Sequence, residues 1–177
     1  MKSLDQNWWF TNKDTGGFVD LHPMHGRDEL PNNAEACRVL ADHAYCVKLL
    51  PSINAQEELL RDKWLPDVFG NKNPDVRING LWIGDIKTPA KNTQIKKSTI
   101  NGFVYSEARQ KVSIAIINLF GREYTVQDLK KGIVGALQPD RNKSIEQVWV
   151  ITEKRNLFIV DRKMVFEDII YEALETL

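Results

Sequence analysis

The order of apolar and polar residues along the chain predicts alternating helices and strands. Apolar residues at helical spacing, or a polar stretch typical of a short helix, predict helices at residues 33–45, 54–63, 93–110, 126–137 and 164–174. Short apolar runs bounded by turn residues predict strands at residues 46–50, 76–78, 81–83, 112–119, 145–152 and 157–160. This order predicts an α/β or α+β fold in which one mixed central sheet is flanked by helices.

The first residues show no period that lasts, which predicts a different organisation for them. Residues 1–32 contain two tryptophans, Gly16-Gly17 and two prolines, and we expect an irregular N-terminal arm that packs on the core. Residues 33–177 are expected to form a single domain, because no linker is long enough to split them. His22 and His25 offer a metal-binding pair, but with no third ligand nearby the packed arm is the preferred interpretation.

The strongest turn signal in the chain is Asn79-Gly80, which stands between two short apolar runs. Both residues tolerate positive φ, as a type I′ hairpin turn requires. Such a hairpin would bring together Asp75, Asp85 and Lys87. Asp85 and Lys87 are two apart on one strand and therefore share a face.

A regular two-residue hairpin would place Asp75 on the opposite face from Asp85. In such a hairpin the residue numbers of two cross-strand partners always add to 159. Asp75 would therefore lie opposite Gly84 and would share its face. One extra residue restores a common face, and we expect either a bulge at Gly84 or an Asp75 that precedes the strand.

Two carboxylates and a lysine at this hairpin suit phosphodiester hydrolysis. That reaction needs an activated water and neutralisation of charge on phosphate, which divalent metals provide. Mg²⁺ prefers carboxylate oxygens, so Asp75 and Asp85 are candidate ligands, and Lys87 would position water or phosphate. A turn role for Asp75, and a simple ion pair of Asp85 with Lys87, are the structural alternatives.

Composition and charge narrow the possible partners. The 177 residues carry 24 basic and 24 acidic side chains, so any contact with nucleic acid must rely on a local patch. Basic clusters at 96–97, 130–131 and 141–143 are candidates for phosphate contacts, although such clusters are usually solvated faces. Cys37 and Cys46 are expected to be reduced and buried, and neither a membrane span nor the apolar core of a signal peptide is found.

Pro74-Asp75 followed by Asp85-Ile-Lys87 resembles the signature of the PD-(D/E)xK nuclease superfamily. The elements around it extend the likeness: the helix from residue 33 and its strand at 46–49, the Glu107–Gln110 segment before 116–119, and the strand at 145–151. This succession resembles the C-terminal toxin domains of contact-dependent growth inhibition (CdiA-type) proteins, especially the tRNA-cleaving group. The resemblance covers roughly residues 33–162.

The resemblance implies a restriction-endonuclease-like core and a divalent metal, Mg²⁺ before Mn²⁺ or Zn²⁺. The acid that the family carries on its first helix matches Glu35, and the hairpin acids match Asp75 and Asp85, so these three are the predicted metal ligands. Some of the toxins place their lysine on a following helix, where this chain offers Arg109, Gln110 and Lys111 and the choice of base stays open. Gln110 joins Lys87 among the catalytic candidates. Plain helix capping is the alternative for Glu35, as the N3 partner of Asn32, and for Gln110.

The resemblance also implies partners and a place of action. The substrate would be tRNA or other RNA, with DNA as the second choice, and a cognate immunity protein is expected. The domain would be delivered from another cell as part of a secreted protein and would act in the cytoplasm. Two rival functions stay open: a metal-independent ribonuclease of the barnase and colicin D type, and a non-catalytic binding protein on the same fold.

Overall fold

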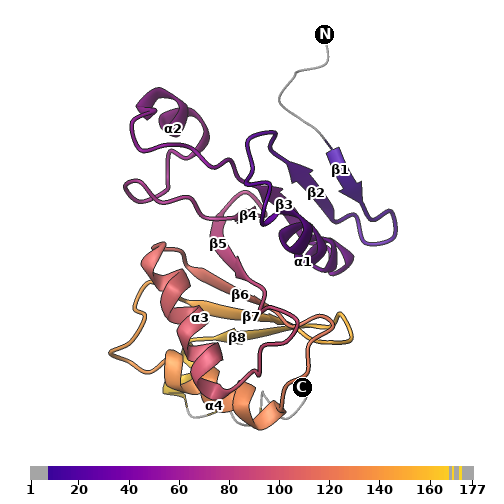
Figure 1. Ribbon diagram of the computed structural model, residues 1–177, viewed down its shortest axis with the longest axis vertical. Coiled ribbons are helices and arrows are strands. Elements are labelled where there is room, and N and C mark those ends of the chain that lie inside the picture. Colours follow the sequence, from indigo (N-terminus) through magenta and orange to yellow (C-terminus); the bar gives the residue numbers. More distant parts are fainter. Residues whose placement is uncertain (1–7, 168, 170–171, 173–177) are drawn as a thin grey trace. The chain divides into compact units, whose positions relative to one another are not determined.

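The computed structural model describes residues 8–167, 169 and 172, and within them it contains eight strands and five helices. The chain divides between Gly84 and Asp85 into two compact units (Figure 1). Strand β5 (Trp82–Lys87) begins in the first unit and ends in the second. The mixed α/β class predicted from the sequence is confirmed.

The first unit contains a sheet with both parallel and antiparallel strand pairs. Strand β1 pairs antiparallel with β2, β2 pairs parallel with β3, and β3 pairs antiparallel with β4. Its elements are β1 (Trp8–Thr11), β2 (Phe18–Leu21), α1 (Leu30–Asp42), β3 (Cys46–Leu49), α2 (Glu58–Trp64) and β4 (Val76–Ile78).

The predicted irregular arm therefore contains two strands, and the boundary placed after residue 32 falls inside α1. A compact turn at residues 12–17 creates the β1–β2 hairpin, because the side chain of Asn12 accepts hydrogen bonds from the N–H groups of Asp14 and Thr15. Gly17 passes so close to α1 that a Cβ there would lie 2.0 Å from the carbonyl oxygen of Ala41. Short strands and a side-chain-built turn leave no lasting period in the sequence, which explains why the pattern missed them.

The second unit contains a smaller mixed sheet with helices beside it (Figure 1). Strand β6 pairs parallel with β7, and β7 pairs antiparallel with β8. The elements are α3 (Lys97–Arg109), β6 (Ile114–Asn118), α4 (Val126–Ala136), β7 (Gln147–Ile151), β8 (Leu157–Asp161) and α5 (Lys163–Phe166). All five residues of β6 are buried, as the continuous apolar run predicted.

Helices α3 and α4 pack closely against each other. A Cβ at Gly132 would lie 2.5 Å from the Cβ of Ile100, so a side chain at this position would push the helices apart. Thr125 caps α4, since its hydroxyl accepts a hydrogen bond from the N–H of Asp128 at 3.1 Å. The buried residues of α3 are Ile100, Val104 and Glu107.

The structure also bears on the predictions for the last helix, the two cysteines and a membrane span. Five of the eleven residues of the helix predicted at 164–174 lie outside the described residues, within which α5 ends at Phe166. Both cysteines are free, but only Cys37 is buried and Cys46 is half-buried. No helix in the described part of the chain is long and apolar enough to cross a membrane.

Candidate functional site

The β4–β5 hairpin has the predicted turn but a different register. Asn79 and Gly80 both have positive φ, 49° and 73°, and the N–H of Leu81 donates to the carbonyl of Ile78 at 3.0 Å. The ladder starts one residue later, with Ile78 opposite Trp82. Leu81 is therefore the extra residue, and the predicted bulge at Gly84 is wrong.

This register removes the difficulty that a regular two-residue hairpin would place Asp75 and Asp85 on opposite faces. Gly84 pairs with Val76, so paired residues sum to 160 instead of 159. Along their own strands, Asp75 and Asp85 are the next residues beyond that pair, and Asp75 also precedes the first residue of β4. Of the two expected solutions, the Asp75 that precedes the strand is therefore present, and the extra residue lies at Leu81 instead of Gly84.

In the first unit, Asp75 is buried within a hydrogen-bond network. Its side chain Oδ1 accepts a hydrogen bond from Nδ2 of Asn33 at 3.0 Å, and the same amide nitrogen lies 3.3 Å from Nε2 of His25. Nδ1 of His25 lies 2.6 Å from the carbonyl oxygen of Leu50. A carbonyl can only accept, so His25 carries its proton on Nδ1 and accepts from Asn33 through Nε2.

The network is nearly closed to solvent. The exposed fractions are 7% for His25, 3% for Asn33 and 6% for Asp75. Main-chain bonding adds a further tie, because the N–H of Leu50 donates to the carbonyl of Asp75 at 2.8 Å. These bonds fix the orientation of the Asp75 carboxylate.

The charge of Asp75 acts on a neighbouring thiol. Burial is the larger cause, and the charge of Asp75 the second, of a pKa of Cys37 well above its ordinary value. Cys37 therefore stays protonated at neutral pH, and it is a packing residue of α1.

In the second unit, Asp85 forms an ion pair with Lys87. Nζ of Lys87 lies 2.6 Å from Oδ2 of Asp85, and the side chains are 27% and 3% exposed, respectively. Alternation along β5 places both side chains on one face, as predicted. A nearly fully buried carboxylate requires such a partner, so the pair contributes to the local fold as well as to the predicted chemistry.

The remaining candidates lie on helices. Helix α1 begins at Leu30 with Glu29 at its N-cap, so Glu35 is not at N3 and the predicted capping box with Asn32 is wrong. Glu35 is half-buried in the body of that helix. Gln110 is the half-buried C-cap residue of α3, which agrees with the capping interpretation.

Among the described residues, no group of three or more His, Cys, Asp or Glu side chains is arranged to hold a metal ion. The predicted set of Glu35, Asp75 and Asp85 therefore stays a prediction. The donor chemistry of the two hairpin carboxylates suits a hard divalent cation, because such cations prefer oxygen ligands.

Sequence reasoning missed three buried polar residues. His25 was considered only with His22, and Asn33 only as part of a helix, although both organise Asp75. Glu107 is fully buried and its Oε1 accepts the N–H of Ile116 at 3.0 Å, which ties α3 to β6. The sequence did contain a signal for Glu107. It follows Ile100 and Val104 at helical spacing and so falls at a core position, where a charged residue usually has a specific role.

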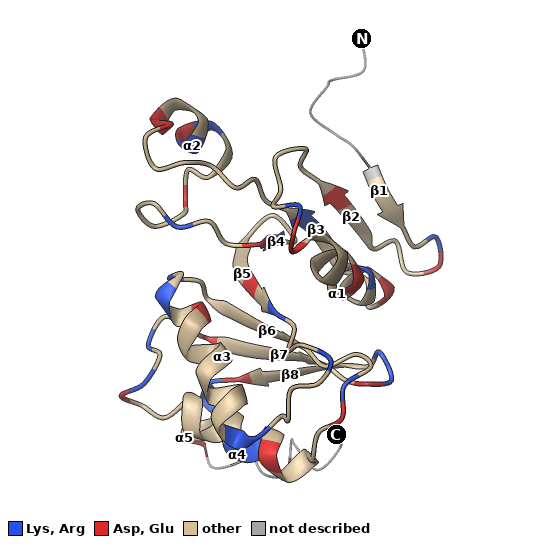
Figure 2. Cartoon of the chain, viewed as in Figure 1, with Lys and Arg blue, Asp and Glu red and all other residues tan. Residues whose placement is uncertain are grey.

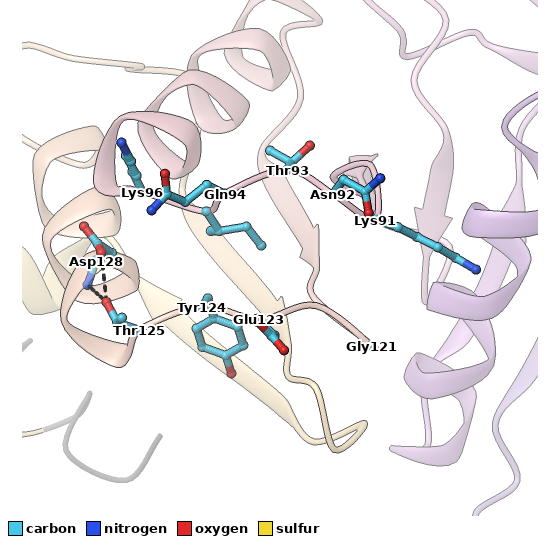
Figure 3. A pocket seen from close by; sticks show the side chains of 11 residues that line it. Lys91, Asn92, Thr93, Gln94, Lys96, Gly121, Glu123, Tyr124, Thr125 and Asp128 are labelled. Carbon is cyan, nitrogen blue, oxygen red and sulfur yellow. Dashed lines mark hydrogen bonds between the residues drawn. The ribbon is translucent and has the colours of Figure 1, made fainter.

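A polar hollow lies in the second unit between two connecting segments (Figure 3). It is lined by residues 91–96, before α3, and by residues 121, 123–125 and 128, at the start of α4. Asp128 joins the two segments, because its Oδ1 accepts the N–H of Lys97 and its Oδ2 accepts the hydroxyl of Thr125. These hydrogen bonds, with the Thr125 hydroxyl first, lower the pKa of Asp128.

Comparisons with known proteins point in one direction. No curated protein sequence matches the chain. Residues 72–157, just under half of the chain, match the family model described as the contact-dependent growth inhibition CdiA C-terminal domain.

Over most of its length the chain is similar in fold to one chain in a solved structure, the "CdiA-CT/CdiI toxin and immunity complex from Burkholderia pseudomallei". The TM-score is 0.51 and the identity is 23%, over 78% of this chain and 91% of that chain. The present chain thus has a fold like that of a protein from a toxin and immunity complex, and its central segment, with the β4–β5 hairpin, is similar to the CdiA C-terminal domain.

Proposed function

We propose that this chain is a toxin module that acts as a nuclease and hydrolyses phosphodiester bonds in RNA, with tRNA as the favoured substrate and DNA as the second. The observation that carries the proposal is the match of residues 72–157 to the CdiA C-terminal domain, because this segment contains Asp75, Asp85 and Lys87. The partly buried Asp85–Lys87 ion pair supports the assignment, since it holds a carboxylate and an ammonium group side by side at the position of the motif.

Each candidate residue has a proposed role. Asp75 and Asp85 bind a divalent cation, Mg²⁺ before Mn²⁺ or Zn²⁺, and Glu35 completes its ligands. When bound, such a cation supplies water activation and charge neutralisation at phosphate. Lys87 holds the attacking water or a phosphate oxygen, and Gln110 donates a further hydrogen bond to the substrate.

The biological setting follows from the same likeness. Because the structurally similar chain comes from a toxin and immunity complex, we propose that a cognate immunity protein binds this chain. We further propose that a secreted protein of the CdiA type delivers it from another cell, and that it acts in the cytoplasm.

The deciding experiment incubates the protein with total tRNA and with plasmid DNA, each with Mg²⁺, Mn²⁺, Zn²⁺ or a chelator. We expect cleavage of tRNA that requires metal and falls at least about a hundredfold in Asp85→Ala. Asp14→Ala, in the exposed β1–β2 turn, is the matched control and should leave cleavage unchanged.

Each other result selects a rival function. Cleavage that persists in chelator would assign the chain to the metal-independent ribonucleases. The absence of cleavage of both substrates with every metal would refute the enzyme and favour a binding protein on this fold.

A further inference from the structure

A basic groove runs between the outer faces of α3 and α4 in the second unit. We call it the α3–α4 groove, and its side chains include Lys97 and Tyr105 from α3, Lys131 from α4, and Arg141 from the segment after α4. The sequence places these basic residues in three separate clusters, and the fold brings one from each to the same groove.

The groove differs in charge from the rest of the surface. Lys and Arg residues are spread over both units among Asp and Glu residues (Figure 2), and the net charge of the chain is zero. The hollow of Figure 3 also contains charges of both signs, because Lys91 and Lys96 line it together with Glu123 and Asp128. The described residues that line the α3–α4 groove include no acid.

The three cations of the groove are available to a ligand. Among the described residues, none of them forms an ion pair. Asp128 is the acid whose pKa responds to Lys131, but its two oxygens already accept hydrogen bonds from Thr125 and from the N–H of Lys97. Clustered cations without a carboxylate partner attract an anion.

Two of the residues that line the groove are glycines. Gly102 and Gly135 both line it, and a glycine inside a helix costs about 1 kcal/mol relative to alanine. At Gly135 a Cβ would come within 3.2 Å of Nδ2 of Asn101. At Gly102 a Cβ would meet nothing within 4 Å, so helix packing does not require a glycine at this exposed position of the groove.

Tyr105 adds an aromatic surface beside the cations. Its side chain is 58% exposed, and the hydroxyl alone does not explain why so large a ring stays in solvent. Exposed aromatic rings next to basic side chains are the two elements that bind single-stranded nucleic acid, the ring by stacking on a base and the cations by contact with phosphates.

We propose that the α3–α4 groove binds a single-stranded segment of RNA, with Lys97, Lys131 and Arg141 on its phosphates and Tyr105 stacked on a base. The proposal rests on the proposed function, because it names the surface that holds the substrate of that nuclease. The ring favours RNA over an acidic protein surface, for which cations alone would suffice.

The test measures binding instead of cleavage, so that it is independent of catalysis. A fluorescent single-stranded RNA oligonucleotide is titrated with the full chain carrying Asp85→Ala, in chelator, at several salt concentrations. Two further variants are made in this background: the triple Lys97→Gln, Lys131→Gln, Arg141→Gln, and the single Tyr105→Ala. The matched control removes three exposed lysines that do not line the groove, Lys13→Gln, Lys154→Gln and Lys163→Gln.

We expect the groove triple to weaken binding at least about tenfold and to flatten the slope of log affinity against log salt by about 2, since each phosphate contact on a single strand contributes about 0.7. Tyr105→Ala should weaken binding about tenfold with an unchanged salt slope. The control triple should change neither quantity by more than about twofold, and thermal unfolding should confirm that every variant is folded.

Equal loss in the groove triple and the control triple would overturn the proposal, as would the absence of RNA binding in the parent. Competition by polyglutamate that depends on the three cations but not on Tyr105, with RNA binding unaffected by the triple, would make the groove a protein-docking surface and also overturn it. Groove-dependent RNA binding by a chain that cleaves nothing would uphold this inference and refute the nuclease.

Discussion

The two units stabilise a buried acid in different ways. In the first, Asp75 accepts a hydrogen bond from the neutral amide of Asn33, which His25 orients in turn. In the second, Asp85 is paired with the ammonium group of Lys87. The first arrangement orients a carboxylate through an uncharged hydrogen-bond donor, whereas the second places a carboxylate beside a cation.

The difference bears on the proposed chemistry. Asp75 acts electrostatically on Cys37, because its charge is the second cause, after burial, of the raised pKa of that thiol. We propose that Lys87 compensates Asp85 before a cation binds and would become available to water or phosphate once a cation takes over that role. One acid is therefore held by geometry and the other by charge, and substitutions should affect them differently.

The largest effect is expected from Lys87→Met, which leaves the carboxylate of Asp85 buried without its ammonium partner. The free energy of unfolding should fall by about 3 kcal/mol, as measured by urea denaturation at pH 7. Asp85→Asn with Lys87→Met should recover most of this loss, because no buried charge then remains. If the double variant is as unstable as Lys87→Met alone, the loss of stability comes from the packing of the lysine side chain and not from the loss of its charge.

Several parts of this arrangement could be predicted from the sequence because their signals are local. Asn79-Gly80 set the turn through two positive φ angles, Thr125 capped α4, and the two-residue spacing of Asp85 and Lys87 placed them on one face. Each depends on residues within a few positions of one another, where backbone preference determines the result.

The support of Asp75 could not be predicted in this way. Asn33 and Asp75 are 42 positions apart, and Leu50 accepts from His25 across 25 positions, so only the packed fold brings them together. The register of the hairpin was missed for a related reason. Leu81 was assigned to the strand by its apolar character, but it lies 73% exposed as the extra residue of the turn.

The second prediction concerns the neutral network. Asn33→Leu keeps the size of the side chain and removes the donor to both His25 and Asp75, leaving two buried polar groups without this amide. We expect a loss of about 2 kcal/mol in urea denaturation, smaller than for Lys87→Met because no ion pair is broken. His25→Leu should cost a similar amount, and the double variant less than the sum. Strict additivity would show that the three residues do not act as one network.

An exposed acid of the first unit provides the third test. Arg77 donates two hydrogen bonds to Asp67, and these bonds, more than its charge, lower the pKa of that carboxyl. Because the folded pKa lies below the unfolded value of about 3.9, this stabilisation is present above about pH 4 and is lost as the pH falls through the folded pKa. Arg77→Met should cost less than about 1 kcal/mol at pH 7, since Asp67 is 44% exposed. The loss should shrink on acidification in urea denaturation, and a loss that is equal at pH 7 and pH 3 would exclude the ion pair as its cause.

The smallest effect is expected at Cys37, whose thiol reports on the charge of Asp75. Half-buried Cys46 should react with iodoacetamide at pH 8 well before Cys37, because burial raises the pKa of Cys37 and shields it from the reagent. Asp75→Asn removes the second cause of that raised pKa, so the alkylation of Cys37, followed by mass spectrometry, should become a few times faster. Asn33→Leu loosens the same network but keeps the charge, and therefore separates the electrostatic effect from local opening. If Asn33→Leu accelerates alkylation as much as Asp75→Asn does, local opening explains the change and the charge of Asp75 is excluded as its cause.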